Sequence, residues 1–235
     1  MKDTTKISLG IILTILIYAI AQLISLIIRI PIEFIPSTFL VHTTMLILSG
    51  IFIYYFQSRK LLNFKIKRIK FKLIFRVILT SIIAFIIVAV ISNILFKIFH
   101  IPSEKANPFL KFTPLQMFVF VLIYASIAEE MLFRGLLLNM LEPLRNNGIK
   151  IMKTNISVPV IISGVLFGLA HFILLKTDAG IPFVIRTVFL TTTIGIIASY
   201  FQEKYENNTL VAIIAHMTVN ALGLLGLMLT LSMSK

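Results

Sequence analysis

The sequence contains no cysteine and no tryptophan, and only 9 of its 235 residues are acidic. Without cysteine there can be no disulfide framework, thiol nucleophile, iron–sulfur cluster or thiolate zinc site. Charged residues make up 13% of the chain and apolar residues 58%, against about 25% and about 45–50% in soluble domains. These values exclude a soluble globular domain and a disordered chain. Any chemistry must come from carboxylate, imidazole, hydroxyl or amide groups.

Basic residues outnumber acidic ones by 22 to 9, which gives a net charge of +13. The densest basic stretch, residues 59–72, holds seven Lys and Arg and no acid. Because apolar segments flank it, this stretch fits a cytoplasmic loop under the positive-inside rule. A specific phospholipid or regulator site is the alternative. We therefore expect a cytoplasmic N-terminus, contact with membrane lipids, and no nucleic-acid partner.

Apolar segments long enough to cross a bilayer recur along the whole chain. The sequence therefore predicts an all-α, polytopic transmembrane helical bundle of about seven spans. The expected spans are residues 7–28, 34–57, 73–96, 112–141, 156–175, 181–202 and 209–231. The first is expected to be a retained helix, because its apolar run is too long for a typical signal peptide. Residues 97–111 are expected to form an aqueous loop.

Three charged residues, Glu129, Glu130 and Arg134, interrupt the fourth apolar segment. A charge in the hydrocarbon region costs about 2.5–3.5 kcal/mol on insertion scales, so these residues require an explanation. Glu130 and Arg134 are four residues apart and can pair on one helical face. Glu129 is turned about 100° away, without a partner in its own helix, and is available for chemistry. An ion network that merely holds helices together is the alternative.

Two further spans carry an imidazole beside small or polar residues. His171 shares a helical face with Gly164 and Gly168, so the face that admits a neighbouring backbone also carries the imidazole. His216 and Asn220 lie one turn apart, and both can donate hydrogen bonds to one small group. His171, His216 and Glu129 all lie in the middle portion of their spans, so they could converge in one polar cavity. A simple interhelical hydrogen bond is the alternative for each histidine.

Other polar residues show no such pattern. His42 and His100 have no partner at a suggestive spacing, so we expect them to be packing or interfacial groups. Arg186 is expected to extend outward to the membrane interface. Thr191, Thr192 and Thr193 are expected to bond to helix carbonyls or to form a polar wall of the cavity.

These residue types suit hydrolysis without a covalent nucleophile. A carboxylate and an imidazole that converge on a water molecule form a general base. His216 and Asn220 would then donate to the oxyanion of a tetrahedral intermediate. Alternatively, Glu129, His171 and His216 could ligate zinc, as in catalytic sites with two histidines and one carboxylate. No His-Glu-x-x-His motif is present, so three separate helices would have to assemble such a site.

Three short motifs, in order on separate spans, resemble those of a known family. They are Glu129-Glu130-x-x-x-Arg134, Phe167-x-x-x-His171 and His216-x-x-x-Asn220. With them the chain is similar to the CPBP, or Abi, intramembrane proteases, which are CAAX prenyl protease and bacteriocin-processing relatives of the type II CAAX endopeptidases. The resemblance covers about residues 112–225. The first three predicted spans match only in being hydrophobic.

The resemblance implies a membrane-embedded endopeptidase. In such an enzyme Glu129 and His171 activate water, and His216 and Asn220 stabilise the oxyanion. The supporting residues are Glu130, Arg134 and Phe167. The family is named for metalloproteases, which leaves a divalent metal such as zinc open, yet the same residues support a metal-free glutamate mechanism.

The resemblance also defines a division of the chain and a class of substrate. Residues 1–235 are expected to form one integral membrane domain, with three spans in residues 1–111 and the catalytic core in residues 112–235. The expected partner is a hydrophobic or membrane-associated peptide. Bacterial relatives are linked to peptide maturation, bacteriocin self-immunity or signalling, and the Ile- and Lys-rich composition suggests a bacterial cell membrane, which argues against a prenylated substrate.

Two functions of other classes are the alternatives to a protease. One is a non-enzymatic membrane immunity or scaffold protein that binds a partner. The other is a proton-coupled transporter, in which intramembrane Glu and His are also usual. The absence of an evident inverted repeat in the sequence counts against the transporter.

Overall fold

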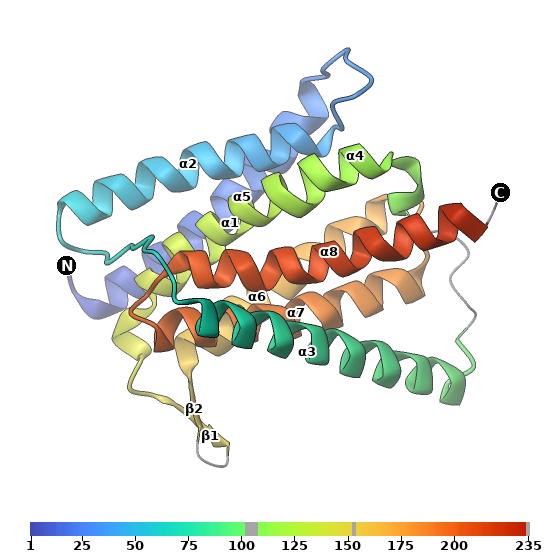
Figure 1. Ribbon diagram of the computed structural model, residues 1–235. Coiled ribbons are helices and arrows are strands. Elements are labelled where there is room, and N and C mark those ends of the chain that lie inside the picture. Colours follow the sequence, from blue (N-terminus) through green and yellow to red (C-terminus); the bar gives the residue numbers. More distant parts are fainter. Residues whose placement is uncertain (102–107, 152–153, 234–235) are drawn as a thin grey trace.

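The protein is an all-α membrane bundle in the computed structural model (Figure 1), which describes residues 1–101, 108–151 and 154–233. Within these ranges, seven helices of 19 to 28 residues are long and apolar enough to cross a membrane. They are α1 (Asp3–Ile27), α2 (Thr38–Ser58), α3 (Phe71–Ile98), the fourth span (Pro114–Leu138), the fifth span (Val158–Lys176), α7 (Ile181–Lys204) and α8 (Thr209–Met233). The predicted fold class and span count are confirmed. The loop predicted at residues 97–111 lies partly outside the described residues.

The fourth span is an irregular helix. It begins with α4 (Pro114–Gln116), where Thr113 and Gln116 form a capping box. Two π-helical segments, Met117–Ala125 and Met131–Leu138, then flank the short α5 (Ser126–Glu130). π-Helical turns are rare and occur frequently at functional sites. Glu129 and Glu130 are therefore the last two residues of the short α-helical segment that separates the two π-helical segments.

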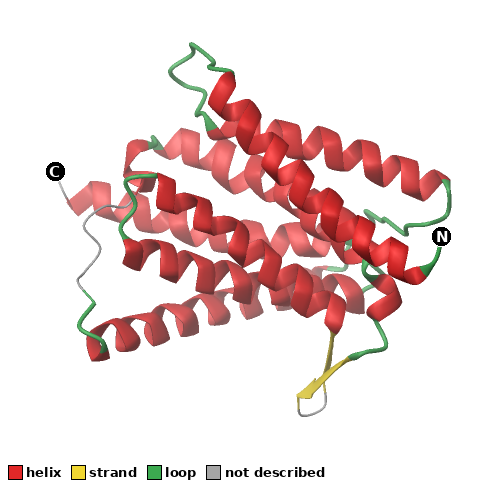
Figure 2. Ribbon diagram, turned by 180° about the vertical axis from the view of Figure 1, so that it is seen from behind, coloured by secondary structure: helices red, strands yellow, loops and turns green. Residues whose placement is uncertain are grey.

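A short β-hairpin connects the fourth span to the fifth. Strands β1 (Gly148–Ile151) and β2 (Thr154–Ser157) pair antiparallel and project from one end of the bundle (Figure 2). Ser157 then caps α6 (Val158–Ala170), which continues as a 3₁₀ helix over His171–Lys176. The fifth span, predicted to begin at about residue 156, begins two residues later at Val158, because Ile156 pairs within the hairpin and Ser157 caps the helix.

The fourth span and α8 are the most buried spans, with 39% of an apolar 18-residue stretch inside the bundle, compared with 22% for α1 and α3. Large apolar side chains on the outer faces, such as Ile51, Ile87 and Leu225, are about half exposed. In a membrane these faces contact lipid. The span that carries Glu129, Glu130 and Arg134 is thus one of the two most enclosed by protein, which is where a bilayer protein can hold charge.

Glycines allow α6 and α7 to pack very closely. A Cβ atom on Gly168 would overlap the side-chain hydroxyl of Thr192. A Cβ atom on Gly195 would lie 3.0 Å from the Cα of Gly164 and 2.8 Å from Nη2 of Arg134. The small-residue face predicted from Gly164 and Gly168 is confirmed, and it lies against α7.

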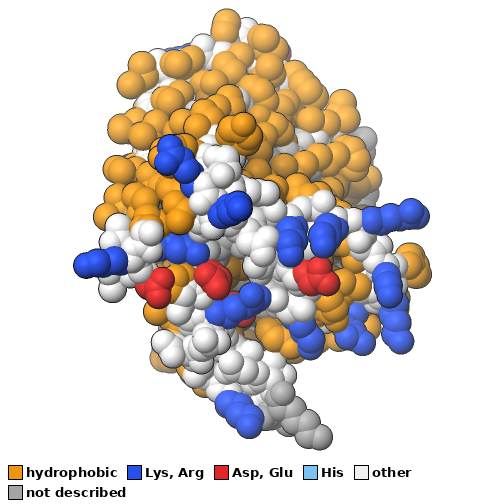
Figure 3. Space-filling model, turned by 90° about the vertical axis from the view of Figure 1, so that its left-hand side faces the viewer, with side chains coloured by type: hydrophobic (Ala, Val, Ile, Leu, Met, Phe, Trp, Pro, Cys, Tyr) orange, Lys and Arg blue, Asp and Glu red, His pale blue; other side chains and the backbone are white. Residues whose placement is uncertain are grey.

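The N-terminus and the basic loop lie at the same end of the bundle, opposite the C-terminus (Figure 1). Figure 3 shows Lys and Arg side chains gathered across this end. The basic loop is tied to the turn between α7 and α8, since Asn208 accepts from the backbone N–H of Lys67 at 3.1 Å and donates to its carbonyl at 2.9 Å. At the opposite end Lys111 bonds to Asp178 at 2.6 Å and holds the pKa of that carboxyl below its usual value.

The close approach of α6 and α7 predicts a large difference between two glycine substitutions. Gly195→Ala should lower the free energy of unfolding by about 1–3 kcal/mol, as overpacking does, because its methyl group meets both the Gly164 backbone and Arg134. Gly223→Ala on α8 is the matched control, since a methyl group added there has no heavy atom within 4 Å. Thermal unfolding in detergent measures both. Equal melting temperatures would contradict the close packing of Gly195.

Candidate active site

A fully buried ion pair joins Glu130 to Arg134. Arg134 Nη1 donates to Glu130 Oε1 at 3.0 Å, and neither side chain is exposed. Arg134 Nε donates to Ser199 Oγ on α7 at 3.3 Å, and the guanidinium carbon lies 4.4 Å from the centroid of the Phe167 ring. This is the pair that the i,i+4 spacing predicts, with a cation–π contact added from α6.

His216 bridges the two adjacent glutamates. Its Nδ1 lies 2.9 Å from Oε1 of Glu130, and its Nε2 lies 3.7 Å from Oε2 of Glu129. Because a carboxylate only accepts hydrogen bonds, Nδ1 carries a hydrogen and donates to Glu130. Glu130 therefore orients the imidazole so that Nε2 faces Glu129, because the hydrogen bond at one ring nitrogen sets the role of the other.

Glu129 is the more accessible of the two acids. Its side chain is 16% exposed, whereas that of Glu130 is completely buried. Its carboxylate faces His216 through one oxygen and His42 through the other, and it lies within electrostatic range of His171. Within the described ranges, Glu129 has no partner in its own helix, and its imidazole partners come from other helices. A partly exposed carboxylate surrounded by imidazoles can take up and return a proton.

The Phe167 ring contacts both imidazoles of the predicted site. Its centroid lies 5.0 Å from that of His171 and 5.3 Å from that of His216, and both contacts are edge-to-face. His171 Nδ1 donates to the backbone carbonyl of Phe167 at 2.9 Å. The neutral ring therefore keeps Nε2 as the nitrogen that can accept a proton. Phe167 holds the two imidazoles and the guanidinium of Arg134 around one aromatic ring.

Asn220 lies beside the cluster but is engaged elsewhere. Its amide nitrogen donates to the carbonyl of Val121 at 3.1 Å and to Ser126 Oγ at 3.0 Å. These bonds use both amide hydrogens and join α8 to the fourth span. The structure therefore does not aim Asn220 and His216 at a common acceptor, and the predicted oxyanion role would require one of these bonds to open.

Two residues in the first half of the chain reach the site, and sequence patterns pointed to neither of them. His42 Nε2 lies 3.3 Å from Glu129 Oε1, so the expectation that it is only a packing or interfacial group was wrong. Tyr18 donates to the carbonyl of Ala170 at 2.6 Å, next to His171, and lies within electrostatic range of Glu129. The only sequence signal was a histidine inside an apolar span, because spacing cannot show a contact between residues 87 positions apart.

The arrangement does not fit a resident metal ion. Among the described residues, no group of three His, Asp or Glu side chains is placed to hold one. Of the three ligands proposed from sequence, His171 and His216 each donate from Nδ1 to a protein acceptor, so only Nε2 of each ring is left for a metal. Zinc would need its ligand atoms to converge at about 2.0–2.2 Å from one point.

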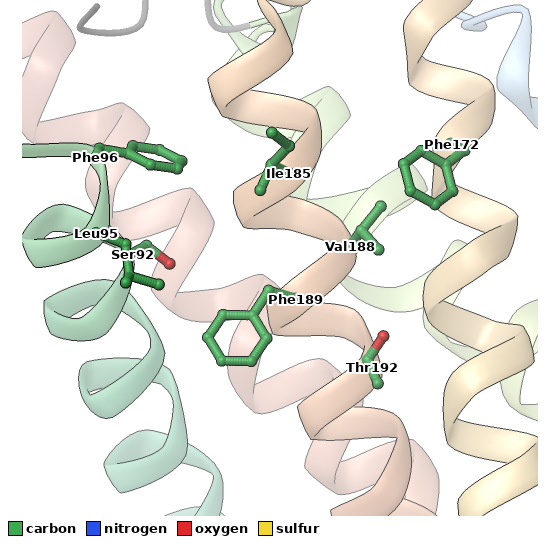
Figure 4. Close-up of a pocket in the computed structure, with 8 residues that line it drawn as sticks. All are labelled: Ser92, Leu95, Phe96, Phe172, Ile185, Val188, Phe189 and Thr192. Atoms are coloured by element: carbon green, nitrogen blue, oxygen red, sulfur yellow. The ribbon is translucent and has the colours of Figure 1, made fainter. Parts of the chain in front are cut away.

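An apolar pocket of about 380 Å³ is lined by α3, α7 and Phe172 of the fifth span, and none of its lining residues belongs to the charged cluster (Figure 4). Its lining residues are Ser92, Leu95, Phe96, Phe172, Ile185, Val188, Phe189 and Thr192. None is charged, so this pocket suits a hydrocarbon chain rather than hydrolysis. Arg186, expected to extend outward, donates to Asn93 on α3 at 2.8 Å in an exposed position.

Residues 111–222 match the family model described as Rce1-like, type II CAAX prenyl endopeptidase Rce1-like. The matched segment begins just before the fourth span and ends two residues after Asn220. It therefore contains all three polar motifs and leaves α1, α2 and α3 outside. No curated protein and no solved structure matches the chain.

The two adjacent glutamates should differ in their effect on stability. Glu130→Gln leaves the buried Arg134 without its countercharge, and removal of one partner of a buried pair costs about 3–5 kcal/mol. Glu129→Gln keeps a similar shape at a partly exposed position and should cost much less. The melting temperatures of the two variants, purified in the same detergent, test this difference. Similar losses would show that Glu129 is equally structural.

Proposed function

Residues 111–222 belong to the type II CAAX prenyl endopeptidase Rce1-like family, and from this premise we propose that the protein hydrolyses a peptide bond within the membrane. The observation that carries the proposal is the cluster in which His216 faces Glu129 at 3.7 Å and His171 lies within electrostatic range of it, each from a different span. Glu129 is partly exposed and is flanked by imidazoles. A general base must come within hydrogen-bond reach of the water that it deprotonates, and this partly exposed carboxylate can do so.

We propose that Glu129 acts as the general base. It takes a proton from water, and the hydroxide formed attacks the scissile carbonyl carbon to give a tetrahedral intermediate. Glu129 then returns the proton to the leaving amine as the C–N bond breaks. His171, whose Nε2 is not used by its bond to the Phe167 carbonyl, assists in orienting the water.

His216 is proposed to stabilise the oxyanion. In its protonated form it presents Nε2–H toward the reacting group, while Glu130 accepts from Nδ1 and stabilises the positive charge. Arg134 in turn neutralises Glu130 at 3.0 Å. The Asn220 amide is one turn away and would be a second donor after exchange of a bond to Val121 or Ser126.

The proposed substrate is a hydrophobic or lipidated peptide. The site lies on transmembrane spans whose outer faces are apolar, so a peptide that reaches it must be compatible with hydrocarbon. We further propose that the basic end of the bundle, with the N-terminus, faces the cytoplasm.

Glu129→Gln should lower the rate of peptide cleavage at least about 100-fold, because a general base contributes about 10²–10⁴ in rate. Purified protein in liposomes would be given a panel of prenylated and unmodified hydrophobic peptides, with products identified by mass spectrometry. Glu206→Gln is the matched control, since this acid is exposed in the turn before α8 and pairs with Lys67. Cleavage that survives Glu129→Gln would overturn the mechanism. A cellular phenotype that survives it would favour an immunity or scaffold function.

Chelators should leave cleavage unchanged, because the donor atoms do not converge on a metal position. The assay would be repeated after dialysis against EDTA and after treatment with phenanthroline, with bound metal measured by elemental analysis. Loss of cleavage that is restored by added zinc, together with one zinc ion per chain, would show that the side chains rearrange around a metal.

A further inference from the structure

We infer that His42 is a positioning residue for Glu129, so that the first half of the chain completes a site whose motifs all lie in residues 111–222. This inference rests on the proposed function. His42 lies on α2, and its Nε2 is 3.3 Å from Oε1 of Glu129. The two side chains are 12% and 16% exposed, so little water competes for this contact.

The direction of the hydrogen bond follows from the surroundings of the ring. Nδ1 of His42 is buried and has no hydrogen-bond partner in the part of the chain that the structure describes. A buried N–H without an acceptor costs about 1–3 kcal/mol, so the single hydrogen of the neutral ring belongs on Nε2. His42 therefore donates to Glu129, and the carboxylate accepts through Oε1.

Packing holds the His42 ring against the fourth span. The ring meets Tyr124 edge-on, with centroids 6.5 Å apart. The neighbouring Thr43 bonds to the Tyr124 hydroxyl at 2.8 Å, and Phe39 stacks on the same ring at 5.2 Å. Three contacts of α2 with one tyrosine leave His42 little freedom to turn away. The donor is thus fixed before substrate arrives.

The two carboxylate oxygens of Glu129 therefore have different roles. Oε1 is fixed by His42, and Oε2 faces His216 at 3.7 Å, beyond hydrogen-bond distance. One oxygen is anchored, and the other remains to take the proton from water. Without His42 the carboxylate could rotate about its last bond, and a misplacement of about 1 Å can cost about 100-fold in rate.

The test compares two substitutions at position 42. His42→Leu removes the donor, and we expect kcat to fall about 10–100-fold with KM changed less than about twofold. His42→Gln places an amide N–H close to the position of Nε2, and it should recover at least about half of that loss on a logarithmic scale. His100→Asn is the control, because it removes an exposed imidazole at the end of α3, where φ is 51° and asparagine is tolerated.

Three kinetic results would overturn the inference. They are unchanged kcat in His42→Leu, a His42→Gln variant as slow as His42→Leu, or a loss confined to KM. In the Glu129→Gln background, His42→Leu should give no further loss, because a positioning residue acts only through the group that it positions. If the wild-type protein and His42→Leu cleave at the same rate, the inference about His42 is wrong. The proposed function is then unaffected, because cleavage itself has been observed.

A second measurement does not depend on cleavage. The melting temperatures of His42→Leu, Glu129→Gln and the double variant form a cycle. If His42 anchors Glu129, the shift in the double variant will be smaller than the sum of the single shifts. Additive shifts would overturn the inference, even if the wild-type protein cleaves none of the peptides.

Discussion

The requirement to neutralise one guanidinium in the interior of a membrane bundle organises this structure. Arg134 cannot reach water, so Glu130 supplies its countercharge, Ser199 a hydrogen-bond acceptor and Phe167 an aromatic face. Gly195 gives it room, because any side chain there would collide with it. These partners come from α5, α6 and α7, and His216 of α8 joins through Glu130. The ion pair is therefore the centre at which the helices of the matched segment meet, and the reactive groups are arranged around it.

The irregular backbone of the fourth span belongs to the same arrangement. π-Helical turns leave carbonyls that the regular ladder would satisfy, and within a bilayer such groups need partners from protein. The carbonyl of Arg134 receives two donors, Asn139 Nδ2 and Gln202 Nε2, both at 2.9 Å. Ser163 on α6 donates to the carbonyl of Phe133 at 3.0 Å. The widened turns are tolerated in this span because polar side chains of α6 and α7 supply the missing hydrogen bonds. Such donors can reach the span only where it is packed against other helices, which accounts for its burial.

Local spacing was enough to predict much of this fold. Apolar runs located the seven spans, an i,i+4 interval located the Glu130–Arg134 pair, and Gly164 with Gly168 marked the close helix face. Contacts between distant segments could not be read in this way. His42 and Tyr18 look like ordinary span residues until the fold brings α1 and α2 to Glu129, and Asn220 stood at the right interval from His216 yet bonds to a different helix. The hairpin was missed because its apolar Ile156 merges with the following span.

The hydrogen bonds between Asn208 and Lys67 couple parts of the chain that differ in kind. Asn208 lies inside the matched segment, whereas Lys67 precedes α3 and lies outside it. The backbone of Thr209 also donates to the carbonyl of Lys65 at 3.0 Å. These hydrogen bonds fix the segment before α3 beside the start of α8, the helix that carries His216. The segment with the recognisable motifs is therefore joined to the chain that precedes it at two places: at the start of α8, and at Glu129, which His42 of α2 contacts.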